Sequence, residues 1–153
     1  MQPTKTRYLI TETAITIAIN VLLSEAFAWL VFHRAHAIAA PAIVRDAIPQ
    51  TFIVAFMGSL VPSLIARSRL RSGLVAQFPS RIPFIRNPFV RAVILALIAT
   101  VIGVTVSAIL IPVVWPQGMN FGTTLWMKGI YGALVAALIT PLAVSSALSE
   151  ATP

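Results

Sequence analysis

The sequence predicts an all-α, polytopic membrane protein with four transmembrane helices in a single membrane domain, residues 1–153. Apolar residues make up 58% of the chain and charged residues only 10%, whereas a soluble domain carries about 25% charged residues. Four apolar stretches of 20 residues or more alternate with polar breaks, and about 20 helical residues span a hydrocarbon core. A backbone in lipid must satisfy its own hydrogen bonds, so these stretches are expected to be helices.

The first stretch, about 8–32, is apolar but carries a polar stripe. Thr13, Thr16, Asn20 and Ser24 follow one another at spacings of 3, 4 and 4, which places them on one helix face. Glu25 lies about one turn from the outer end. Ionisable residues inside a membrane are functional candidates because they are costly to bury. Asn20, Ser24 and Glu25 are therefore the candidate polar or ion path.

A structural role is the alternative for the two carboxylates of this stretch. Glu25 can pair with His33, Arg34 or Arg45 near the outer surface, or reach the headgroups. Glu12 is expected to meet Arg7 or Arg91 at the inner face.

The remaining stretches, about 47–66, 92–114 and 129–148, carry small residues at helical spacing. Membrane helices pack where small side chains let their backbones approach closely. The positions expected to do this are Gly103, Gly129, Gly132, Ala133 and Ala136. Packing within one bundle is the simpler reading, and a homodimer face is the alternative.

The two halves of the chain resemble each other. A shift of 79 positions superposes Pro62 on Pro141 and Phe52 on Tyr131, and it places the first stretch on the third. This pattern indicates a duplicated helical hairpin with the two copies parallel in the membrane, and two unrelated apolar hairpins are the alternative. Around the two prolines each half resembles a group of small uncharacterised bacterial membrane domains built as one helical hairpin. The resemblance implies this fold and no particular activity.

Positive charge predicts the orientation. The N-terminal segment and the link 67–91 carry eight basic residues, and basic residues concentrate in cytoplasmic loops. The other side carries three, Arg34, Arg45 and Lys128, which Asp46 partly offsets. Both termini are therefore expected in the cytoplasm of a bacterium, with the chain in its inner membrane. Tryptophan agrees, because Trp29, Trp115 and Trp126 all fall at ends assigned to the outer face, where amphipathic rings prefer the headgroup level.

The central link 67–91 mixes arginine with apolar residues and is expected to lie on anionic lipid at the cytoplasmic face. The residues expected to contact headgroups are Arg67, Arg69, Arg71, Arg81 and Arg86. Nucleic acid is not an expected partner, because the orientation rule already accounts for this charge.

The sequence offers little chemistry for catalysis or cofactors. The chain has no cysteine, which removes thiolate metal sites and iron–sulfur clusters. His33 and His36 are spaced to share a helix face, but a third metal ligand is not evident beyond Glu25 or Asp46. No catalytic set, metal or cofactor is therefore predicted.

Two functions fit this sequence. The first is a non-enzymatic accessory or scaffold component of an inner-membrane complex, which meets a membrane-protein partner or a second copy inside the bilayer. The alternative is a small transporter or channel, in monomeric or dimeric form, with its polar path along the first helix.

Overall fold

The computed structural model describes residues 4–77, 85 and 87–149, and these residues form four helices. They are α1 (Lys5–Phe32), α2 (Ala40–Arg71), α3 (Pro88–Val114) and α4 (Phe121–Leu148). Each helix is long and apolar enough to cross a membrane. The prediction of an all-α chain with four membrane-spanning helices is confirmed, and the molecule is a multi-pass membrane protein.

The helices extend beyond the predicted stretches. α2 begins at Ala40 rather than near residue 47, with Pro41 in its first turn, where proline removes no needed hydrogen bond. It also continues to Arg71, so the first three arginines of the predicted link are helical. α4 begins at Phe121 because Asn120 caps it, accepting a hydrogen bond from the Thr123 N–H at 2.8 Å. Arg81 and Arg86 lie outside the described residues.

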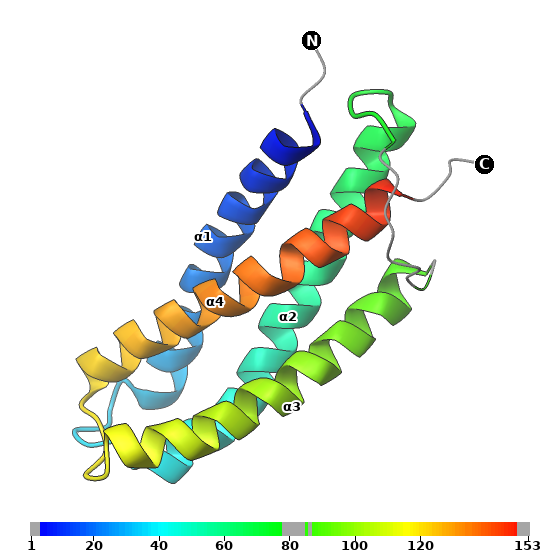
Figure 1. The fold of residues 1–153 in the computed structure, drawn as a ribbon. Helices are drawn as coiled ribbons and strands as arrows, with labels where there is room; N and C mark the ends of the chain where they lie inside the picture. Colours follow the sequence, from blue (N-terminus) through cyan, green and yellow to red (C-terminus); the bar gives the residue numbers. More distant parts are fainter. Residues whose placement is uncertain (1–3, 78–84, 86, 150–153) are drawn as a thin grey trace.

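The two hairpins are interleaved in space. α2 and α4 contact each other at the centre, α1 packs along α4, and α3 packs along α2 (Figure 1). Contacts between α1 and α2, or between α3 and α4, are sparse by comparison. These contacts match those that a two-fold axis between α2 and α4 would give, since such an axis exchanges α1 with α3 and α2 with α4.

The contacts between α2 and α4 follow the spacing of the sequence repeat. Side-chain hydrogen bonds between these helices join residues that are 78 to 82 positions apart along the chain. The two helices therefore run in the same direction, with equivalent levels side by side. This is the arrangement that a parallel duplication with an offset of 79 residues predicts.

The loops that close the two hairpins meet at one end of the bundle, which we call the loop end. Ile38 and Met119 exchange two backbone hydrogen bonds of 2.8 and 2.9 Å, and both side chains are buried. Gly118 has a φ of +82°, and a Cβ there would lie 2.6 Å from the Ile38 carbonyl oxygen. Glycine is thus needed to hold the loops together. We call the opposite end, where α1 begins and α4 ends, the terminal end.

One face of α1 is buried along its whole length. Every fourth residue from Tyr8 to Phe32 is inside the protein, and the row includes Glu12, Thr16, Asn20 and Ser24. Small residues of α4 allow this face to approach. A Cβ on Gly132 would lie 2.1 Å from Ser24 Oγ and 2.9 Å from the Asn20 carbonyl oxygen. The backbones of α1 and α4 therefore touch at this level.

Candidate functional site

Polar side chains line the contact between α2 and α4 from one end of the bundle to the other. We call this set the polar seam. Its members on α2 are Asp46, Gln50, Thr51, Ser59 and Ser63; those on α4 are Lys128, Tyr131 and Thr140; α1 adds Thr16, Asn20 and Ser24; and α3 adds Arg91. Burying polar groups in a membrane helix bundle is costly wherever they do not satisfy one another.

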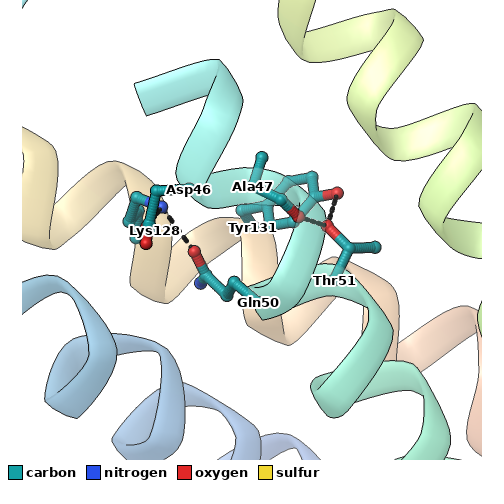
Figure 2. Close-up of polar contacts among 6 residues, drawn as sticks. All are labelled: Asp46, Ala47, Gln50, Thr51, Lys128 and Tyr131. Atoms are coloured by element: carbon teal, nitrogen blue, oxygen red, sulfur yellow. Dashed lines mark hydrogen bonds and ion pairs between the residues drawn. The ribbon is translucent and has the colours of Figure 1, made fainter. Parts of the chain in front are cut away.

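The charged part of the polar seam lies towards the loop end. Lys128 Nζ forms an ion pair with Asp46 Oδ2 and donates a hydrogen bond to Gln50 Oε1 at 2.5 Å (Figure 2). The Phe32 ring centroid lies 5.7 Å from the same nitrogen, so its π face adds a weaker contact. Only 2% of the Lys128 side chain and 9% of the Asp46 side chain are exposed. The ammonium is thus held entirely by protein groups.

Asp46 and Gln50 reach Lys128 together because they lie four residues apart on one face of α2. A carboxylate and an amide oxygen from one helix therefore converge on a cation from the parallel helix. Removing one charge would leave the other buried without compensation. A small cavity of about 10 Å³ adjoins Gln50, Lys128, Tyr131 and Ser107, and this is about the volume that one water molecule needs.

The next level of the polar seam is a pair of hydroxyls. Thr51 Oγ1 donates to the Ala47 carbonyl oxygen at 2.5 Å and lies 2.6 Å from the Tyr131 hydroxyl oxygen (Figure 2). A hydroxyl has one proton, so Tyr131 must be the donor to Thr51. α3 leaves room for this hydroxyl by having a glycine, because a Cβ on Gly103 would lie 2.0 Å from the Tyr131 oxygen.

The middle of the polar seam is built around a proline. Pro62 has no N–H, so the carbonyl of Gly58 loses its helical partner, and Thr140 Oγ1 donates to that carbonyl at 3.2 Å. Asn20 of α1 reaches the same place, with its Nδ2 atom 3.0 Å from where a Cβ of Gly58 would be. Glycine at position 58 thus admits the amide of Asn20 between the three helices.

Beyond this level, α3 joins the polar seam through Arg91. The Arg91 guanidinium donates to Ser63 Oγ at 3.0 Å, and Ser63 Oγ donates to the Ala143 carbonyl oxygen at 3.3 Å. Arg91 is buried although it lies in the first turn of its helix. One arginine therefore ties three helices together.

A second ion pair lies at the terminal end. Arg69 of α2 pairs with Glu12 of α1, and its guanidinium carbon lies 5.6 Å from the centroid of the Tyr8 ring. The expectation that Glu12 meets Arg7 or Arg91 is therefore wrong, because α2 extends far enough to bring Arg69 to it. The Arg69 side chain is still 42% exposed, and its predicted contact with lipid headgroups stays a prediction.

The residues that were predicted to line a polar or ion path differ in how far they are buried in the protein. Asn20 and Ser24 are buried, whereas Glu25 is half-buried beside Gly129, with Oε1 3.3 Å from where a Cβ of that glycine would be. Within residues 4–77, 85 and 87–149, no ion pair of Glu25 is found. The two expected partners next to α1 interact with other groups instead: His33 stacks on Trp29, and Arg34 Nε donates to His33 Nε2 at 3.2 Å.

The small residues predicted for packing are distributed over two contacts. Gly129 and Gly132 face α1, and Gly103 faces Thr51 and Tyr131. Ala136 is fully buried and Ala133 is half-buried. Among the described residues, no group of three or more His, Asp or Glu side chains is placed to hold a metal ion.

The sequence did not predict a site made of Asp46, Gln50 and Lys128. Asp46 and Lys128 were expected outside the bilayer, since the helices were expected to begin after them. The signal that was available is the spacing: Asp46 and Gln50 share a helix face, and Lys128 lies 82 and 78 positions from them, on either side of the repeat offset. Comparisons with protein-family models, curated proteins and solved structures found no match to this chain.

Proposed function

We propose that this protein is a non-enzymatic accessory or scaffold component of a bacterial inner-membrane complex, with both termini in the cytoplasm. One observation carries the proposal: the interior polar groups are mostly used to join helices. The ion pairs Asp46–Lys128 and Glu12–Arg69 each connect two helices, and the Thr51–Tyr131 contact connects α2 to α4. Groups engaged in this way stabilise a bundle and present no reactive centre to a substrate.

The position of Asn20 supports the same function. A transport path requires its polar groups to face water at some stage, but only 1% of Asn20 is exposed, and its amide is enclosed by Gly58 and neighbouring residues of the bundle. The outer faces of the four helices carry large apolar side chains, such as Leu22, Val101 and Leu138. A partner would therefore be met inside the bilayer or at its surface.

Blue-native electrophoresis of gently solubilised native membranes tests this proposal. We expect a tagged chain to migrate with a complex much larger than its own monomer or dimer. Treatment of the same sample with a harsher detergent is the control, and it should release the chain to low mass. Migration as a monomer or homodimer under the gentle condition contradicts the accessory function.

A small transporter is the second candidate, and a specific observation favours it. Four buried polar atoms in or beside the polar seam have no hydrogen-bond partner among the described residues: Asn20 Nδ2, Ser24 Oγ, Gln50 Nε2 and Ser59 Oγ. An unpaired polar group in an apolar interior costs several kcal/mol or holds water. A path along Asn20, Ser24 and Glu25 would lie between the two ion pairs, which would then act as its closures.

Flux measurements in liposomes that contain a pH-sensitive dye test the transporter. If a path exists, the wild-type protein carries a pH-dependent flux, and Glu25→Gln abolishes it without unfolding the protein. Thr11→Val on the exposed side of α1 is the control and should leave the flux intact. A wild-type flux no greater than that of empty liposomes across several ions rules out transport of those ions.

A further inference from the structure

A groove on the lipid-facing side of the bundle lies near the terminal end. One wall is the face of α1 that carries Ile10, Ala14 and Ile17, and Pro141 of α4 contributes to the other wall. The groove has a volume of about 460 Å³ and is almost entirely apolar. Because α1 and α4 are membrane-spanning helices, this surface faces acyl chains.

The equivalent face of α3, the counterpart of α1 in the repeat, has buried alanines where α1 has groove residues. The offset of 79 residues maps Thr13 and Ile17 of the groove onto Ala92 and Ala96, which are both fully buried. It maps Ile10 onto Phe89, whose ring makes an edge-to-face contact with Phe56 of α2, 5.6 Å between centroids. The groove is thus a specific departure from the symmetry of the bundle.

Two basic residues lie next to the groove where α1 begins. Thr6, which lines it, is flanked by Lys5 and Arg7, and Arg7 precedes Ile10 by three residues, so the two lie on neighbouring positions of one helix face. Arg7 is exposed and forms no ion pair within the part of the chain that the structure describes. An apolar groove that ends at the exposed Arg7 and the half-buried Lys5 matches a phospholipid, which has an apolar chain joined to a charged phosphate.

We propose that this groove binds an anionic phospholipid, with one acyl chain along α1 and the headgroup phosphate at Arg7 and Lys5. The acyl chain supplies apolar contact, and the basic pair selects the headgroup charge. Each basic residue near a membrane surface favours anionic lipid by about fivefold. The site requires only that the chain spans a membrane. Its test is therefore independent of the accessory and transporter proposals.

Native mass spectrometry measures the affinity of this site for lipid. The delipidated full chain is titrated with phosphatidylglycerol or with phosphatidylcholine of equal chain length. We expect the wild-type protein to bind one phosphatidylglycerol at least about fivefold more tightly than phosphatidylcholine. Arg7→Gln should weaken phosphatidylglycerol binding about fivefold more than phosphatidylcholine binding, because the choline group already neutralises the phosphate charge. Equal binding of the two lipids by wild type overturns the headgroup assignment.

A pair of matched double variants tests the groove itself. Ile10→Phe with Ala14→Val gives α1 the residues that α3 has at the equivalent positions, and both changes are at exposed sites. We expect this variant to lose about tenfold in affinity for both lipids. Ile19→Phe with Ala18→Val makes the same two exchanges elsewhere on the exposed side of α1 and should bind as wild type does. If the groove variant binds like the wild type, or if both variants weaken binding equally, the groove is not the site. Circular dichroism of each variant confirms that the helices are retained.

Discussion

At the scale of single residues, the interior depends on charges and amides that are matched across helices. Lys128 is held by a carboxylate, an amide oxygen and an aromatic face from two other helices. A buried ion pair need not stabilise a protein more than an apolar pair of the same shape, but breaking one side of it is costly, because the remaining charge has no partner. The Asp46–Lys128 pair therefore specifies how α2 and α4 align.

Substitutions in this pair give the first prediction. Lys128→Gln or Asp46→Asn alone should destabilise the bundle by about 3 kcal/mol, because each leaves one buried charge unpaired. The double variant should lose less than the sum of the two single losses, since neither charge remains. Unfolding of purified protein in detergent, followed by circular dichroism, measures all three.

Arg45→Gln is the matched control for this cycle, because it removes a charge from the exposed neighbour of Asp46. Its effect should stay within about 0.5 kcal/mol. Additive losses in the double variant would show that Lys128 and Asp46 do not form a coupled pair.

At the scale of helices, small residues decide how close the elements approach. Gly132 lies directly against α1, and Gly103 makes room for Tyr131. Their spacing predicted both positions as packing residues, and the predicted polar stripe that includes Asn20 and Ser24 lies on α1 with those two residues buried. The spacing could not predict which helix each glycine would meet, since close-packing residues look the same whatever their partner.

Helix ends were the least predictable part of the elements. The apolar stretches end where charged residues begin, but helices continue past that point when the charges find partners in the protein. Asp46 and Lys128 are the clearest example, since each was expected outside the bilayer and lies instead in a buried ion pair. Arg69 likewise belongs to α2 because Glu12 of α1 is there to meet it.

Gly132→Leu gives the second prediction. Any Cβ at this position conflicts with Ser24 and with the backbone of Asn20, so a bulky side chain should separate α1 from α4 and cost about 1–3 kcal/mol. Gly122→Leu is the control in the same helix, because the nearest atom to a Cβ there is Asn120 Oδ1 at 3.6 Å. The measurement is the melting temperature in detergent. A Gly132→Leu variant that melts like wild type would mean that α1 does not pack on this face.

At the scale of the whole molecule, the four helices and their repeat were predictable, whereas their pairing was not. Length and hydropathy identify the spans, and the offset between Pro62 and Pro141 identifies the two halves. Neither signal indicates that α1 packs mainly on α4 and α3 mainly on α2, each on a helix of the other hairpin. The pairing of the helices depends on side-chain contacts such as that of Ser24 with Gly132, which the linear sequence does not show.

Topology gives the third prediction. Reporter fusions should place residue 76 and the C-terminus in the cytoplasm, and residues 36 and 117 outside, because basic residues concentrate at the terminal end. Each position is fused in turn to a reporter that is active only in the cytoplasm and to one that is active only outside. The two readings at one position should be opposite, which serves as the control. A C-terminus found outside would require an odd number of crossings and would contradict the four-helix arrangement.

The interleaving of the hairpins has a consequence for how the chain is made. α1 ends at Phe32, but its main packing partner, α4, begins only at Phe121. At about 5–20 residues per second, a ribosome needs roughly 5 to 20 seconds to synthesise the intervening segment. During that interval the face of α1 that carries Glu12, Asn20 and Ser24 has entered the membrane without the helix that later covers it. The newborn chain therefore passes through a stage at which the polar face of its first helix must be sheltered by the insertion machinery, or wait at the edge of the bilayer, until the last helix of the protein has been synthesised.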